Sequence, residues 1–194
     1  MALLLNINNM MTELSLNVLD VANNSISAKA DFIEISICIH RDTDSLRIII
    51  TDNGCGMSKE QLAKVEDPFF TTRTTRGVGL GIPFFKQAAL STGGSFTVES
   101  AIGVGTKVIA VFGLSHIDRM PIGDMNSTIY TLITLNTQID FLYTYEFDEK
   151  LFRLDTRKFR EILGNVPLDS PQVSAYIKEY LEENQTEVDD GYHV

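Results

Sequence analysis

The sequence predicts an α+β fold, a two-layer α/β sandwich in which helices cover one face of a mixed sheet. Three observations predict this class. Over the first 113 residues, helical and strand patterns follow one another in the order helix, hairpin, helix, loop, helix, hairpin, which suits such a sheet. The expected strands alternate apolar and polar residues, as half-buried strands do. Hydrophobic residues make up 44% of the 194-residue chain, which is enough to bury a core.

The first expected element is a helix over residues 11–28. Apolar and small residues recur in it at helical spacing, and polar residues recur on another side at steps of three and four. The first stripe consists of Leu14, Val18, Val21, Ala22 and Ser25, and the second of Glu13, Asn17, Asp20, Asn24 and Ser27. We expect the first stripe to face the core. Taken alone, the second stripe is simply a solvated helix face.

A hairpin and a short helix are expected next. Isoleucine occupies every second position between residues 33 and 39, which predicts a half-buried strand over 32–40. An apolar strand over 46–51 follows the turn, so the two strands form an antiparallel hairpin. Ser58 has the N-cap position and Gln61 the capping-box position of a short helix that reaches about residue 65.

The remaining elements of the first part are a loop, a helix and a second hairpin. Residues 66–78 are rich in Thr, Arg and Gly and are predicted to be the loop. The helix runs from about Leu80 to Ser91, where two glycines stop it. The strands of the second hairpin are expected at 95–100 and 106–113.

Residues 115–194 form a predicted acidic α+β extension of a first domain at 1–114. Asp and Glu outnumber Lys and Arg by 15 to 7 in this extension, whereas the first 114 residues are close to neutral. The expected elements are a helix at 125–135, a hairpin at 141–147 and 150–154, and helices at 156–163 and 170–183, the last with Ser170 as N-cap. The tail is predicted to be disordered from about residue 185. The extension could continue the sheet of the first domain or dock a partner, and its aromatic hairpin favours packing.

Composition excludes several classes of protein. The net charge of −10 without a basic run makes nucleic-acid binding an unsuitable function. No apolar stretch approaches the roughly 18 residues of a membrane helix, and the N-terminus has no signal-peptide pattern. The two cysteines do not suggest a disulfide scaffold. We therefore expect a cytoplasmic protein that does not contact membranes.

Three motifs occur in a fixed order along the first part of the chain. They are Asp20-Val-Ala-Asn-Asn24-Ser-Ile-Ser-Ala, Asp52-Asn-Gly54-Cys-Gly56-Met57, and Asp67-Pro-Phe69-Phe70 continuing to Arg76-Gly77-Val78-Gly79-Leu80-Gly81, with Gly103-Val-Gly105-Thr106 after them. In this order they resemble the N, G1, F and G2 boxes and the final Gly-Thr element of GHKL ATPases. The resemblance covers residues 13–113. Only residues 71–76 separate the F-box aromatics from the glycines, and such a short lid is similar to that of histidine kinases and anti-sigma-type serine kinases.

The resemblance implies a Bergerat-type sandwich that binds ATP with Mg²⁺. Asp20 and Asn24 are four residues apart, so they project from one helical face. An amide oxygen can bind Mg²⁺, which keeps waters and bridges to phosphates, so Asn24 is the predicted metal ligand. A carboxylate one turn earlier can orient or deprotonate a nucleophile, so Asp20 is the predicted catalytic residue. Members of the family usually have Glu, Asn or His at this position, and the shorter Asp leaves its role as a base open.

The resemblance assigns the adenine to the second motif. It implies that the Asp52 carboxylate accepts a hydrogen bond from the exocyclic amine of adenine, and that Gly54 and Gly56 let the base approach the main chain. Met57 would line the slot, and Thr106 would lie beneath the base beside Asp52. By itself, Asp-Asn-Gly is more often a simple turn. Its position after a buried strand favours the functional interpretation.

The third motif would hold the phosphates. Glycines before a helix expose backbone N–H groups, which bind phosphate together with the helix dipole. The residues assigned to this contact are Gly77, Val78, Gly79, Leu80 and Gly81, together with Arg76. Phe70 resembles an F-box aromatic, which the resemblance assigns to the nucleotide site; alternatively it anchors the loop in the core. A lone Gly-x-Gly-x-Gly is a weak signal. A dinucleotide fold is set aside because the glycines do not follow an early strand, and a P-loop is set aside because its Gly-Lys-Ser/Thr end is missing.

The leading functional hypothesis is an ATP-dependent protein kinase-like subunit that transfers the γ-phosphoryl group to a separate partner protein. None of the three histidines, His40, His116 and His193, is expected on a helix beside an acidic residue, so a phosphoacceptor within the chain is not expected. A second hypothesis is a non-catalytic switch, in which ATP orders residues 66–78 and changes the affinity for a partner. A third is a scaffold that binds no nucleotide. The sequence does not predict the oligomeric state.

Overall fold

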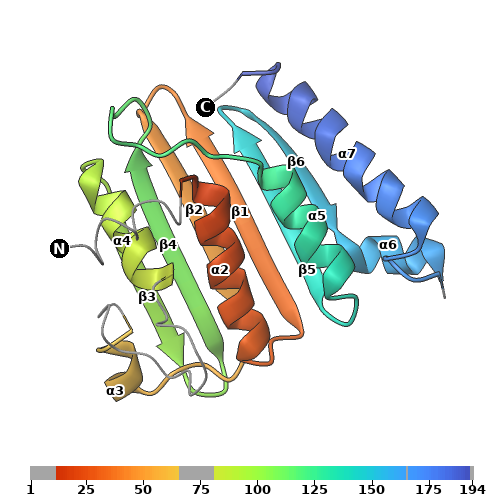
Figure 1. Cartoon of the computed structure of the whole chain (residues 1–194), viewed down its shortest axis with the longest axis horizontal. Helices are drawn as coiled ribbons and strands as arrows, with labels where there is room; N and C mark the ends of the chain where they lie inside the picture. The colour runs from red at the N-terminus through yellow and green to blue at the C-terminus, as the bar shows by residue number, and fades with distance from the viewer. Residues whose placement is uncertain (1–11, 66–80, 165, 193–194) are drawn as a thin grey trace.

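The structure is a computed structural model, and it describes residues 12–65, 81–164 and 166–192. Its six strands form one sheet in the order β3-β4-β2-β1-β5-β6, and helices lie on one face of that sheet (Figure 1). The strands are β1 (Phe32–His40), β2 (Ser45–Asp52), β3 (Ser95–Ala101), β4 (Gly105–Gly113), β5 (Asp140–Phe147) and β6 (Lys150–Asp155). The helices are α2 (Leu14–Ser27), α3 (Lys59–Leu62), α4 (Gly81–Ser91), α5 (Met125–Leu135), α6 (Thr156–Leu163) and α7 (Pro171–Asp189).

The predicted α+β sandwich with a mixed sheet is confirmed. Strand β1 pairs in parallel with β5, and every other strand pair is antiparallel. Helices α2, α4 and α5 lie across the same face in Figure 1, and α7 lies beside β6. The alternating side chains of β1 explain this arrangement, because its four isoleucines are fully buried under the helices while the residues between them are half-buried.

The extension continues the sheet of the first part. All eight residues of β5 pair with β1, from Phe32 opposite Asp140 to Ile39 opposite Phe147. A single hydrophobic core runs under both parts. The alternating aromatics of β5 are buried in it, which agrees with the expectation that this hairpin serves packing: Phe141, Tyr143, Tyr145 and Phe147. Of the two arrangements that the sequence left open, the structure therefore has the continued sheet.

The segment between β4 and α5 also holds the first helix in place. The backbone N–H groups of Leu14 and Ser15 donate to the carbonyls of Pro121 and Ile122 at 2.9 and 2.8 Å. The N-cap residue Glu13 makes no side-chain capping bond, so these carbonyls satisfy donors that the helix itself cannot. Helix α2 thus depends on both parts of the chain.

Three details differ from the sequence prediction. Asn17, expected on the solvated stripe of α2, is fully buried, because α2 is enclosed on more sides than one stripe. Helix α3 ends at Leu62, earlier than expected, although its predicted capping box between Ser58 and Gln61 is present. Ser170 has the N-cap position of α7, but its side chain makes no capping bond.

The largest difference concerns the tail. Helix α7 continues to Asp189, whereas we expected it to end at Glu183 and order to be lost from about 185. The prediction is wrong for residues 185–189, since tertiary contacts hold the last turns. The buried Asp189 accepts a hydrogen bond from the Tyr145 hydroxyl at 3.0 Å, and Lys150 pairs with Asp190 at 2.9 Å. Sequence polarity alone does not reveal such anchors.

None of the helices within residues 12–65, 81–164 and 166–192 combines the length and apolar character that crossing a membrane requires.

Candidate functional site

Asp52 is the centre of a hydrogen-bonded cluster where β2 ends. Its side chain is 8% exposed. One carboxylate oxygen, Oδ1, accepts the backbone N–H of Gly54 at 2.9 Å and that of Thr106 at 3.3 Å. The other oxygen, Oδ2, accepts the hydroxyl of Ser25 at 2.6 Å. A buried carboxylate needs such donors, because burial without them carries a large desolvation cost.

These bonds join three elements and the turn after β2 around one side chain. Ser25 belongs to α2, Asp52 to β2, and Thr106 lies directly opposite Asp52 on β4. The turn after β2 is also held against the end of α2, since the Cys55 backbone N–H donates to the carbonyl of Ala28 at 2.8 Å. The predicted neighbours Asp52, Gly54 and Thr106 therefore lie together.

The turn at Gly56 packs against the β3–β4 hairpin. Gly56 has a φ of 65°, which favours glycine, and a Cβ atom there would overlap the carbonyl of Ala101. The Met57 backbone N–H donates to the Ser100 hydroxyl at 2.9 Å, and that hydroxyl lies 2.9 Å from the hydroxyl of Thr106. Met57 and Thr106 are thus linked through one serine, and both remain partly exposed at this end of the sheet.

Asp20 lies against the start of α4. A Cβ atom at Gly81 would overlap the Asp20 carboxylate, so this glycine leaves the room that the carboxylate occupies. Asn24 is one turn further along α2, is half-buried, and directly precedes Ser25. Helix α2 therefore carries Asp20 beside the start of α4, and Asn24 next to Ser25 of the Asp52 cluster.

Six predicted site residues lie outside the described residues: Phe70, Arg76, Gly77, Val78, Gly79 and Leu80. Of the glycine-rich motif, the structure describes Gly81 alone. Its position beside Asp20 is the observation that connects this residue of the third motif to the first motif.

The turn after β2 has a second anchor that the sequence did not indicate. The Asn53 side-chain oxygen accepts the backbone N–H groups of Asp31 and Phe32 at 3.1 and 3.0 Å. The carbonyl of Asp31 in turn accepts the backbone N–H of Asp140, the first residue of β5. The residue beside Asp52 is therefore tied to the extension.

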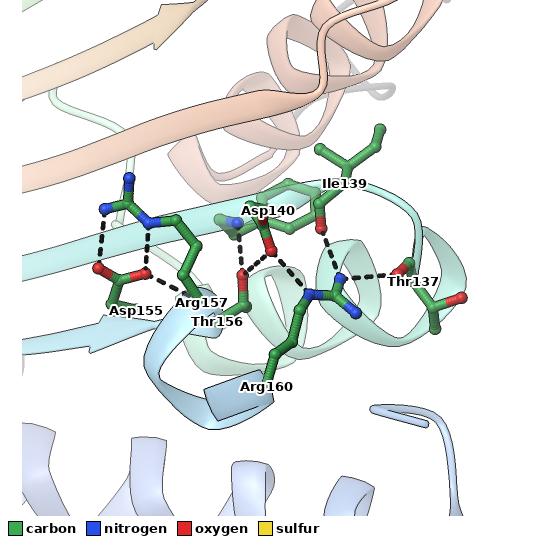
Figure 2. Close-up of polar contacts among 8 residues, drawn as sticks. Thr137, Ile139, Asp140, Asp155, Thr156, Arg157 and Arg160 are labelled. Carbon is green, nitrogen blue, oxygen red and sulfur yellow. Dashed lines mark hydrogen bonds and ion pairs between the residues drawn. The ribbon is translucent and has the colours of Figure 1, made fainter. Parts of the chain in front are cut away.

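A polar cluster of the extension surrounds this junction (Figure 2). Arg160 binds the Asp140 carboxylate at 2.8 Å and the carbonyl of Thr137 at 2.7 Å. Arg157 lies over the ring of Phe32 at 4.5 Å and pairs with Asp155, whose pKa its hydrogen bonds hold below the ordinary value. These contacts hold the start of β1, where Phe32 donates its backbone N–H to Asn53.

The polar side chains near Asp52 include groups that could hold a nucleotide with a magnesium ion. Residues 12–65, 81–164 and 166–192 contain no group of three His, Cys, Asp or Glu side chains that could hold a metal ion. Mg²⁺ commonly takes one or two protein ligands and completes its shell with waters and substrate phosphates. The amide of Asn24 fits that requirement, and the Asp52 carboxylate is an acceptor suited to an amino group.

Sequence reasoning missed Ser25, Asn53 and Ser100 as members of the site. Ser25 did carry a signal, since it is the one hydroxyl among the apolar residues of its stripe on α2. The roles of Asn53 and Ser100 depend on tertiary contacts, with the backbone at Asp31 and Phe32 and with Met57, so spacing could not reveal them.

Comparison with known proteins adds the remaining finding. Residues 5–116 match the model of a family described as "Histidine kinase-, DNA gyrase B-, and HSP90-like ATPase". A "Putative sensor protein" of Shewanella frigidimarina is 32% identical over 104 residues, which are 53% of this chain and 16% of that protein. A "Probable C4-dicarboxylate sensor kinase" of Bacillus subtilis is 37% identical over 78 residues, which are 40% of this chain and 15% of that one. The matched stretch is thus a small part of each relative.

Among solved structures, the N-terminal domain of a DNA repair protein has a similar fold. The TM-score is 0.56 at 17% sequence identity, and the match covers 76% of this chain and 54% of that one. At this identity the likeness supports the fold alone.

Proposed function

Because this chain belongs to the histidine kinase-, DNA gyrase B- and HSP90-like ATPase family, we propose that it binds Mg-ATP at the Asp52 cluster and transfers the γ-phosphoryl group to a separate protein. The observation that carries the proposal is the convergence of α2, the end of β2, the start of β4 and the start of α4 around Asp52 and Asp20. This convergence supports one common location for the family's motifs, of which the third is represented by Gly81.

In this proposal the adenine amine donates to the Asp52 carboxylate. This role of Asp52 is supported because its two carboxylate oxygens already accept three hydrogen bonds, which hold the carboxylate in one orientation. Met57 would contact the face of the base, and Thr106 would lie beside Asp52 beneath it. Gly54 and Gly56 would keep the main chain close to the base.

The triphosphate would extend from the adenine along α2 towards the start of α4. Asn24 would hold Mg²⁺ through its amide oxygen, and the bound ion would neutralise charge on the phosphates. Backbone N–H groups of Gly77–Gly81, with Arg76 and Phe70 nearby, would contact the phosphates. Asp20 would orient or deprotonate the acceptor hydroxyl supplied by the partner.

A transfer assay tests this function. Purified chain is incubated with γ-labelled ATP, Mg²⁺ and the products of neighbouring genes, and label on each protein is measured. The account expects label on one partner, and a loss of about 10²-fold or more in the transfer rate for Asp20→Asn, since a positioned base contributes at least that much. Tight ATP binding without any transfer would contradict the kinase function.

One observation favours a second candidate, the non-catalytic switch. The Asp20 carboxylate fills the space beside Gly81, so it supports the start of α4. A carboxylate with that packing role has less freedom to act on an acceptor. ATP would then act by changing the affinity of the chain for a partner protein.

Two substitutions separate the candidates. A switch should keep its ATP-dependent partner binding in Asp20→Asn and lose it in Asn24→Ala, because only the second change removes the metal ligand. A kinase should lose phosphoryl transfer in both variants. Partner affinity with and without Mg-ATP, measured beside the transfer rate, decides between them.

A further inference from the structure

Ser25 makes the shortest hydrogen bond to the Asp52 carboxylate. Its Oγ lies 2.6 Å from Asp52 Oδ2, whereas the two backbone donors lie 2.9 and 3.3 Å from Oδ1. The side chain of Ser25 is 3% exposed. Its other contact, with the carbonyl of Val21, is longer at 3.4 Å. The single hydroxyl proton is therefore directed at Asp52.

The three donors restrain the carboxylate in different ways. Gly54 and Thr106 hold Oδ1 from the strand side, and their backbone N–H groups do not depend on side-chain identity. Among the residues that the structure describes, Ser25 is the one that holds Oδ2, from the helix. A carboxylate held at one oxygen can still rotate about its side-chain bond, whereas one held at both oxygens has a fixed plane. Ser25 therefore determines where the remaining acceptor position of the carboxylate points.

We propose that Ser25 is a positioning residue that sets the Asp52 carboxylate to accept the exocyclic amine of an adenine ring. The proposal rests on the adenine site proposed above and adds the side chain that orients its carboxylate. The same bond joins α2 to the end of β2.

Ser27 provides a matched control on the same helix. Its hydroxyl is exposed and donates to the backbone carbonyl of Asn23 at 2.8 Å, so it does not touch the Asp52 cluster. Ser25→Ala and Ser27→Ala remove the same atom from the same helix. A difference between them comes from the contact with Asp52 and not from helix propensity.

The test measures dissociation constants for two nucleotides with Mg²⁺ by calorimetry. One is ATP, and the other is purine riboside triphosphate, which lacks the C6 amine. We expect Ser25→Ala to weaken ATP binding about tenfold, because an oriented charge-assisted bond is lost, and to change binding of the amine-free nucleotide less than twofold. Ser25→Thr, which restores a hydroxyl, should recover most of the ATP affinity. Ser27→Ala should bind both nucleotides as the unmodified chain does.

The outcomes are separable. If Ser25→Ala weakens the binding of both nucleotides equally, Ser25 only stabilises the fold and the inference is wrong. A lower melting temperature of Ser25→Ala would show that loss of stability independently. If Ser25→Ala binds ATP as tightly as the unmodified chain, the inference is also wrong while the ATP site stands. If the unmodified chain does not bind ATP, the proposed function itself fails.

Discussion

At the scale of single residues, the site depends on two glycines whose missing side chains leave space for neighbouring atoms. A Cβ atom at Gly56 would overlap a backbone carbonyl, and one at Gly81 would overlap a carboxylate. Backbone cannot move aside as a flexible side chain can, so the first position should be the stricter one. Glycine residues at these positions were predicted from the motif. The neighbours that require glycine, Ala101 on β3 and Asp20 on α2, are known only from the structure.

Two of the glycines with positive φ near the site separate strain from overlap. Gly56 and Gly103 have φ values of 65° and 73°, but no atom lies within 4 Å of a Cβ built at Gly103. We expect Gly103→Ala to lower the free energy of unfolding by about 1 kcal/mol, the cost of the backbone conformation alone. Gly56→Ala should cost at least about 2 kcal/mol, because the Ala101 carbonyl must also move.

Urea denaturation of both variants measures this difference. Equal losses would mean that the turn at Gly56 relaxes freely and does not hold the second motif against the β3–β4 hairpin.

At the scale of elements, the position of each helix and strand was well predicted, while the long-range contacts between them were not. Helix α5 and helix α6 have the bounds expected from periodicity and flanking residues. The predicted end of α7 was wrong, because Tyr145 and Lys150 on the β5–β6 hairpin hold the last turn of this helix. Local patterns predict where a helix can form, and long-range partners decide how far it continues.

The anchor of α7 can be tested at Tyr145. Its hydroxyl donates to the buried Asp189, and burial together with this carboxylate raises the pKa of Tyr145 well above the ordinary value, so the donor stays protonated. Tyr145→Phe removes a donor from a buried carboxylate and should lower the free energy of unfolding by about 1–3 kcal/mol. Hydrogen exchange should speed up first at 185–189.

Tyr176→Phe is the control for this change. Tyr176 lies on the same helix but is 54% exposed, so removing its hydroxyl should have little effect on unfolding. If both variants unfold at the same denaturant concentration, the bond between Tyr145 and Asp189 does not stabilise α7.

At the scale of the whole molecule, the motif order predicted the family and the sandwich, but a division into two domains stays a prediction. One sheet and one hydrophobic core run through both parts, and the carbonyls of Pro121 and Ile122 satisfy the first donors of α2. Sequence patterns left open whether the extension continues the sheet or docks a partner, so they could not reveal this dependence. It follows from strand pairing between β1 and β5, which connects residues about 110 positions apart.

A chain of residues 1–114 tests that dependence. It would turn β1 into an exposed edge strand and remove the carbonyl partners of Leu14 and Ser15. We expect this fragment to melt at a lower temperature than the full chain and to bind Mg-ATP more weakly. A fragment with unchanged melting temperature and affinity would show that residues 1–114 form an independent domain.

The central claim is that Asn24, Asp52 and the start of α4 serve one Mg-ATP molecule, and calorimetric titration of ATP with and without Mg²⁺ tests it most directly. We predict one site in the full chain. Asp52→Ala should weaken ATP binding in both conditions, by about tenfold or more for a lost charge-assisted bond. Asn24→Ala should abolish only the part of the affinity that Mg²⁺ adds. Absence of binding to the full chain, or unchanged binding in both variants, would contradict the account.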